Sequence, residues 1–358
     1  MRFLTVTNTS MIRKLLILFL VLGGLYYAKA VLMPLCVGGV LASLLLPLCR
    51  TLEDRKVPRV LAVLVCLVVF LATVAGLGSL VVWQLSELTG DFALIQEAAR
   101  EMAKSLQVMI ANQLGISFQM QARLLQDEQP SIAGVLQFLL GSLAYVVTNF
   151  IFISAYIFLF LYYRSHLRAF LMKLIAPAQK EEMEKVLQGV THVSQRYLLG
   201  LAKMIVLLWI LYGLGFYLIG VKNALFFAVL CGLLEIIPYI GNLVGSTLTL
   251  FVAYANGASG ALMLGILGTY AAVQFIQGWI LEPIILGPHV KLNPFATIVA
   301  LVLGNQLWGI SGIFLAIPLV AMLKIVCDHI ESLKPYGFLM GEPASTRRKT
   351  SEAAKILK

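Results

Sequence analysis

A single carboxylate stands inside the most apolar part of this sequence. Glu235 is the only formally charged residue between Asn223 and Leu281, and it opens the segment Glu-Ile-Ile-Pro-Tyr-Ile-Gly-Asn at 235–242. A carboxylate in hydrocarbon is costly unless it is paired, hydrated or protonated. Such a group predicts a proton- or cation-exchanging site. It could equally cap the backbone N–H groups that Pro238 leaves without partners, so both interpretations stay open.

Other polar and helix-breaking residues accompany this carboxylate. Pro238 removes an intrahelical hydrogen bond and Gly241 permits a tight turn. A second break follows at 304–312, where the glycines could also serve helix packing alone. The candidate residues of a solute or ion pathway are Glu235, Pro238, Tyr239, Gly241, Asn242, Gln274, Gln277, Asn305, Gln306, Gly309 and Gly312.

The stretch that separates the two breaks is rich in prolines. Three prolines and one glycine within residues 282–294 predict an ordered, non-helical connector. A further proline, at position 318, should kink the arm that follows the second break. The residues expected to shape these segments are Glu282, Pro283, Gly287, Pro294 and Pro318.

The composition indicates an integral membrane protein. Of the 358 residues, 60% are hydrophobic and 12% are charged, whereas soluble domains carry about 25% charged residues. The net charge of +10 comes from Lys and Arg scattered through loops, which fits the positive-inside rule better than nucleic-acid binding. The five cysteines and four histidines show no metal-ligand spacing, and no nucleotide-binding pattern occurs, so no metal or cofactor is expected.

Hydropathy predicts an all-α, polytopic membrane protein. Six full spans are expected at about 15–28, 31–48, 60–83, 139–162, 204–221 and 260–281. The two interrupted segments, 224–255 and 294–326, would each reach roughly 50 Å as one helix, against a hydrocarbon core of about 30 Å. Each is therefore a hairpin of two half-helices or a tilted, broken span, which gives six spans with two hairpins or eight spans. The first apolar run lacks a small-residue cleavage site, which predicts that no signal peptide is removed.

The hairpin interpretation predicts an inverted repeat in the C-terminal half. Residues 204–255 and 260–326 would each be a span followed by a broken hairpin, in opposite orientations, as in many secondary transporters. The expected divisions are 1–83 (spans one to three), 84–134 (a polar, amphipathic, extracytoplasmic insert), 135–163 (span four), 164–203 (a basic, amphipathic, cytoplasmic region), 204–327 (the core with both repeats) and 328–358 (a basic cytoplasmic tail).

Three motifs in this order resemble the autoinducer-2 exporter family of permeases. They are Glu-Ile-Ile-Pro-Tyr-Ile-Gly at 235–241, the connector Pro283…Gly287…Val290…Pro294, and Gly304…Gly309-Ile-Ser-Gly312…Ala-Ile-Pro318. The resemblance covers most of the chain. It departs at Asn305, where many members are expected to have glycine.

The resemblance implies a multi-pass protein of the bacterial inner membrane that exports a small solute. Members are associated with efflux of autoinducer-2, a furanosyl molecule of quorum sensing, and others with Na⁺(Li⁺)/H⁺ antiport. The implied partners are the lipid bilayer, the solute, H⁺ or Na⁺, and further copies of the chain in a homo-oligomer, which is expected to be a pentamer.

Two other functional classes compete with this one. Gly309-Ile-Ser-Gly312 matches the Gly-x-Ser-Gly of rhomboid-type proteases, but no histidine lies well inside a predicted span to act as a base. The chain is therefore not expected to be an enzyme. A non-transporting membrane scaffold that uses the amphipathic regions is the second alternative, and solute flux would separate it from a transporter.

The charge balance of the loops predicts which side each one faces. Residues 50–59 carry four basic and two acidic residues, and 164–203 carry seven and three, whereas 84–130 carry three and six. The basic regions and both termini should be cytoplasmic, and the polar insert should be outside. A Ser105→Cys variant in a cysteine-free background should thus react with an impermeant maleimide in intact spheroplasts. Labelling only after lysis would reverse the topology.

Overall fold

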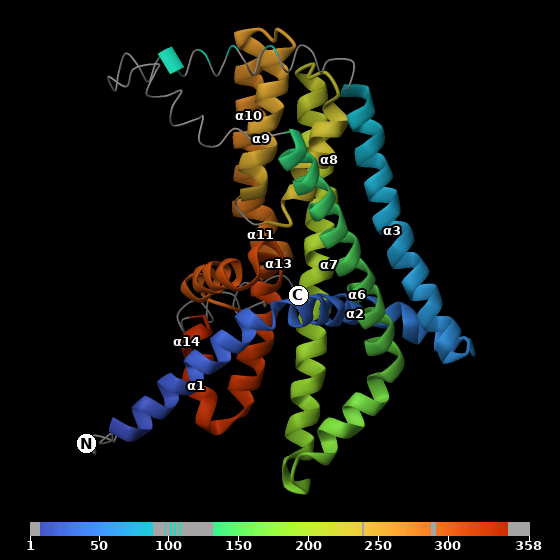
Figure 1. The fold of residues 1–358 in the computed structure, drawn as a ribbon, viewed down its shortest axis with the longest axis vertical. Helices are drawn as coiled ribbons and strands as arrows, with labels where there is room; N and C mark the ends of the chain where they lie inside the picture. The colour runs from blue at the N-terminus through green and yellow to red at the C-terminus, as the bar shows by residue number, and fades with distance from the viewer. Residues whose placement is uncertain are drawn as a thin grey trace, which may run out of the picture. The chain divides into compact units, whose positions relative to one another are not determined.

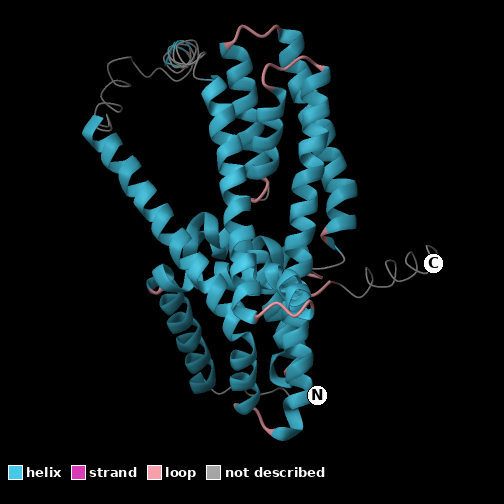
Figure 2. Ribbon diagram, turned by 90° about the vertical axis from the view of Figure 1, so that its right-hand side faces the viewer, coloured by secondary structure: helices cyan, strands magenta, loops and turns pink. Residues whose placement is uncertain are grey.

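The computed structural model describes residues 8–88, 97, 101, 104, 107, 108, 132–237, 240–287 and 291–342. Helices joined by short loops make up nearly all of this part of the chain (Figure 2). Its only β-type pairing is an isolated antiparallel bridge between Leu292 and Gly341. Most of the polar insert 84–134 and the tail beyond Glu342 lie outside the described residues, as do Pro238, Tyr239 and 288–290.

The helices are labelled in Figure 1. In chain order they are α1 (Asn8–Tyr27), α2 (Lys29–Asp54), α3 (Arg59–Leu88), α6 (Ile132–Lys173), the 3₁₀ turn η2 (Pro177–Gln179), α7 (Lys180–Leu218), α8 (Ala224–Leu234), α9 (Ile240–Ala255), α10 (Gly260–Ile276), the π-helical turn η3 (Gln277–Leu281), α11 (Glu282–Ile285), α13 (Pro294–His329), the 3₁₀ turn η4 (Glu331–Leu333) and α14 (Lys334–Met340).

By length and composition alone, six helical stretches among the described residues could cross a bilayer. They are Lys29–Asp54, Arg59–Leu80, Ala144–Lys173, Pro177–Leu218, Gly260–Ile285 and Pro294–His329. Helices suit this setting because every backbone N–H and C=O within them finds a partner in the same segment. The prediction of an all-α, polytopic membrane protein is confirmed.

The amphipathic region predicted at 164–203 is continuous with the spans on either side of it. Helix α6 runs on to Lys173 and α7 starts at Lys180, so only a short turn separates them. That turn forms at Pro177, and the preceding Ala176 is extended (φ −57°, ψ 144°), as a residue before proline prefers to be. The long helices follow because no other proline lies between Ile132 and Leu218.

The chain divides into two compact units. Unit 1 comprises Met1–Val68, Ile151–Leu201 and Ile285–Lys358, and unit 2 comprises Val69–Phe150 and Ala202–Ile284. Helices α3, α6 and α7 each contribute residues to both units. Each unit is described by itself below.

In unit 2, the first interrupted segment is a helical hairpin. Helices α8 and α9 have 11 and 16 residues, or about 17 and 24 Å, so neither is long enough to cross a 30 Å core. A Cβ on Gly241 would collide with the carbonyl of Leu234, and one on Gly245 would press on Cys231. The arms therefore fold back on each other, and the indole nitrogen of Trp209 on α7 donates to the carbonyl of Val229 at 3.1 Å.

In unit 1, the second interrupted segment also turns back. Trp308 (φ −135°, ψ 16°) and Gly309 (φ 60°, ψ −137°) leave the helical region in the middle of α13. A Cβ on Gly304 or on Gly312 would collide with the backbone carbonyl of the other glycine. In a continuous helix these residues would be about 12 Å apart, so the break predicted at 304–312 is confirmed as a hairpin. The Trp308 indole donates to the carbonyl of Leu25 at 3.0 Å and ties the turn to α1.

The close contact between Gly304 and Gly312 predicts that two Gly→Ala substitutions differ in their effect on stability. Gly312→Ala should cost about 1–3 kcal/mol, since a new methyl group has no room against a backbone carbonyl. Gly268→Ala is the matched control, because its Cβ meets no described atom within 4 Å and alanine favours a helix. Thermal unfolding of the purified protein in detergent measures both. Equal midpoints for the two variants would contradict the hairpin contact.

Candidate functional site

Four buried polar side chains of unit 2 meet where helices break. Tyr212 comes from α7, Glu235 caps the C-terminal end of α8, Asn242 lies in the first turn of α9, and Gln277 opens the π-helical turn η3. Their relative exposures are 0, 4, 1 and 2%. We call these four residues the polar cluster.

Hydrogen bonds join the polar cluster into one chain. The Tyr212 hydroxyl donates to Asn242 Oδ1 at 3.3 Å, and Asn242 Nδ2 donates to Gln277 Oε1 at 3.0 Å. Gln277 Nε2 then donates to Glu235 Oε1 at 2.6 Å and to Glu282 Oε1 at 3.3 Å. One amide thus bridges two carboxyl groups, and the chain of donors runs from a phenol to a carboxylate.

The second oxygen of the Glu235 carboxylate lies outside this chain of hydrogen bonds. Glu235 Oε2 is buried and has no hydrogen-bond partner in the part of the chain that the structure describes. A buried acceptor without a partner costs about 1–3 kcal/mol, and more when it is charged. Such an atom is where a proton, a cation or a donor group of a solute would bind with the greatest gain.

The π-helical turn brings Glu282 to the side-chain amide of Gln277. Proline at 283 has no N–H, and in a regular α-helix its ring would clash with the carbonyl of Trp279. An extra residue in the turn avoids that clash, and Gln277–Leu281 adopt this wider turn. Such π-turns occur often at functional sites. The prediction of a non-helical connector is wrong at Glu282–Ile285, which form helix α11.

Only some of the predicted site residues belong to the cluster. Glu235, Asn242 and Gln277 do, and Gly241 allows the close approach of α9 to α8. Gln274 instead donates to the hydroxyl of Tyr270 on the same helix at 3.2 Å.

The second hairpin lies in unit 1. Asn305 and Gln306 are exposed there, Gly309 forms its turn, and Gly312 packs against Gly304. Pro238 and Tyr239 lie outside the described residues.

The connector residues have distinct local roles. Pro294 is the first residue of α13, where a missing N–H does no harm, and the side chain of Asn293 caps this end by accepting from Ala296 N at 2.7 Å. Pro318 is buried within α13, and Gly287 is exposed at the end of the short helical stretch.

Sequence reasoning missed two members of the site. Tyr212 lies in a predicted span 30 residues before Asn242, and nothing in its spacing points to that partner. Glu282 was assigned to the connector, although it accepts from the same amide nitrogen as Glu235. Its position at the end of an apolar stretch that carries two glutamines was the available signal.

The second hairpin gives no support to protease chemistry. Ser311 and His329 lie on the same arm of α13, and about 27 Å of helical rise separates them. A base must lie within hydrogen-bond reach of its nucleophile. His329 therefore cannot activate Ser311.

A multi-pass helical protein whose broken helices enclose a buried polar cluster has the architecture of a membrane transporter. The chain belongs to the AI-2E family transporters, whose sequence pattern matches residues 15–332. It is 25% identical over 311 residues to “Putative transport protein YrrI” of Bacillus subtilis (strain 168), covering 84% of this chain and 87% of that protein. It is 24% identical over 342 residues to “Putative transport protein YhhT” of Escherichia coli (strain K12), covering 94% and 95%.

The hydrogen bonds of the cluster predict that two neighbouring glutamines differ in importance. Gln277→Leu should lower the free energy of unfolding by about 1–3 kcal/mol, because Glu235 Oε1 loses its donor and Asn242 Nδ2 loses its acceptor. Gln274→Leu loses only a half-buried contact with Tyr270 and should change stability much less. Thermal unfolding in detergent is the measurement. A larger loss for the Gln274 variant would show that the cluster does not stabilise the fold.

Proposed function

We propose that this protein is a secondary transporter of the bacterial inner membrane that exports a small polar solute. The observation that carries the proposal is Glu235, a buried carboxylate with one oxygen unpartnered among the described residues, set in a helix break. Intramembrane ionisable groups of this kind commonly mark substrate or ion pathways. Membership of a transporter family supports the same function.

Autoinducer-2 is the solute that we propose first. A furanosyl solute carries several hydroxyl groups, each of which both donates and accepts. The polar cluster offers both donors and acceptors to such a solute. They are a phenol, two amides and a carboxylate whose Oε2 has no partner among the described residues. Amides and hydroxyls recognise such solutes through paired hydrogen bonds.

Na⁺(Li⁺)/H⁺ antiport is the second candidate, and a specific observation favours it. Oxygens of Glu235 and Glu282 converge on the Gln277 amide nitrogen, at 2.6 and 3.3 Å. If the Gln277 amide turned over, its oxygen would join the two carboxyl groups in a set of oxygen ligands for a hard cation. A scaffold without transport activity is the alternative from another class, and it would show no flux of either species.

The proposal also covers the oligomeric state of the protein and the orientation of the chain in the membrane. Both termini should be cytoplasmic, and the protein should form a homo-oligomer, with five copies as the working stoichiometry. Residues 204–255 and 260–326 should superpose as inverted units, since each begins with a span and ends with one of the two hairpins.

Glu235→Gln provides the decisive test. The variant keeps the size and most hydrogen bonds of the side chain but cannot exchange a proton. We expect normal insertion and a flux at least about tenfold lower, equivalent to about 1.4 kcal/mol. Glu331→Gln is the matched control, because that carboxylate is exposed and Lys334, at 3.5 Å, is its one ion-pair partner among the described residues. Glu235→Ala should also lower the unfolding temperature.

The assay is efflux from proteoliposomes between pH 6 and 8, with autoinducer-2 in one series and Na⁺ under a proton gradient in another. Flux of autoinducer-2 alone supports export, and Na⁺ flux alone supports antiport. No flux of either species would favour the scaffold. Normal flux through Glu235→Gln, with only the Ala variant unstable, would make Glu235 a structural cap and redirect the search to Asn305 and Gln306.

A further inference from the structure

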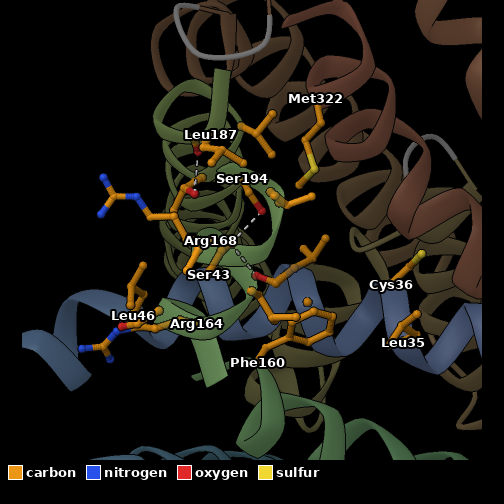
Figure 3. Close-up of a pocket in the computed structure, with 18 of the residues that line it drawn as sticks. Leu35, Cys36, Ser43, Leu46, Phe160, Arg164, Arg168, Leu187, Ser194 and Met322 are labelled. Atoms are coloured by element: carbon orange, nitrogen blue, oxygen red, sulfur yellow. Dashed lines mark hydrogen bonds between the residues drawn. The ribbon is translucent and has the colours of Figure 1, made fainter. Parts of the chain in front are cut away.

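Unit 1 contains a large cavity that the polar cluster does not use. Its volume is about 750 Å³, within the range of about 300–1,000 Å³ that is typical of ligand pockets. One face of α2, the end of α6, the start of α7 and the second arm of α13 supply its walls (Figure 3). All these segments belong to unit 1.

Most of the wall is apolar. Cys36, Val40, Phe160 and Met322 contribute from three helices. Hydroxyls along this wall already have partners: that of Ser43 donates to the hydroxyl of Ser194 at 2.7 Å, and that of Thr191 donates to the carbonyl of Leu187 at 2.9 Å. A hydroxyl-rich solute would find few partners here, whereas a hydrocarbon chain would lose no hydrogen bonds by entering.

The other end of the cavity is cationic. Arg50, Arg164 and Arg168 line it, and Arg50 and Arg168 also line an adjoining cavity of about 500 Å³. Arg164 is paired with Glu53, and Arg168 lies 2.7 Å from Glu184. Arg50 makes no ion pair with another described residue. The Arg50 guanidinium is thus left to bind an anion, and Arg168 lines the same two cavities.

We infer that this cavity binds an anionic glycerophospholipid, with an acyl chain along the apolar wall and the phosphate at Arg50 and Arg168. Guanidinium groups bind phosphate through paired hydrogen bonds, and basic pockets between membrane helices bind anionic headgroups. The basic regions 50–59 and 164–203 are the ones that the positive-inside rule assigns to the cytoplasm, whose leaflet is anionic.

The chain's own tail is a poor occupant. Residues 343–358 carry five basic residues and one acidic residue, so the arginines would repel them. A bound lipid would instead neutralise the arginine cluster and hold α2 against α6, which it crosses with Gly38 beside Tyr156. Anionic lipid should therefore stabilise unit 1, whichever solute the protein moves.

Native mass spectrometry of the full chain in a mild detergent tests this inference. The titrants are phosphatidylglycerol, phosphatidylcholine with the same acyl chains, and inorganic phosphate. We expect phosphatidylglycerol to bind at least about tenfold more tightly than phosphatidylcholine. Arg50→Gln should weaken phosphatidylglycerol binding at least about fivefold, which is about 1 kcal/mol. Arg55→Gln is the matched control, as an exposed arginine close to Arg50 in sequence that does not line the cavity.

A second variant tests the apolar wall. Val190→Phe should fill part of the cavity and weaken the binding of both lipids. Thermal unfolding checks that the variant is folded. Equal affinity for the two lipids would overturn the inference, as would equal losses for Arg50→Gln and Arg55→Gln. Inorganic phosphate binding as tightly as phosphatidylglycerol would reassign the site to a free anion.

Discussion

The side-chain amide of Gln277 is the group on which the polar cluster depends. It donates to Glu235 and Glu282 and accepts from Asn242, so it satisfies three other buried or half-buried groups. Without it, two carboxyl groups would face each other across a short gap in a setting of low dielectric constant, where their repulsion is strong. The π-helical turn that begins at Gln277 is thus part of the site, because in a regular α-helix Glu282, five residues on, would not lie on the same face as Gln277.

The two hairpins meet a second constraint, which is the lack of partners for unwound backbone in hydrocarbon. Both solve it by packing their arms closely through glycines, with Gly241 against Leu234 in one and Gly304 against Gly312 in the other. Close arms leave little backbone open at the break. In the first hairpin, the residue at the break is Glu235, at the C-terminal end of α8. Its carboxylate is the centre of the candidate site.

The sequence predicted the class of fold, both breaks and three members of the cluster. These depend on signals that act locally: apolar length sets the spans, proline and glycine set the breaks, and an isolated charge stands out from its neighbours. Tyr212 and Glu282 could not be found in this way, because their roles depend on which helices pack together. The wider turn at Gln277 was also missed, because Pro283 is compatible with a helix end, a kink or a π-turn. The pocket in unit 1 depends on four segments that are distant in sequence.

The geometry of Gln277 also links the two functional candidates. Its amide nitrogen faces two carboxyl groups and its oxygen faces Asn242, so the present arrangement suits carboxyl groups that accept hydrogen bonds. A proton on Glu235 would turn one acceptor into a donor, and a cation would require oxygen where nitrogen now lies. Either event favours rotation of the amide, which breaks the bond to Asn242 and frees the first turn of α9. Loading of the carboxylate and movement of the hairpin would then be coupled through one side chain, as alternating access requires.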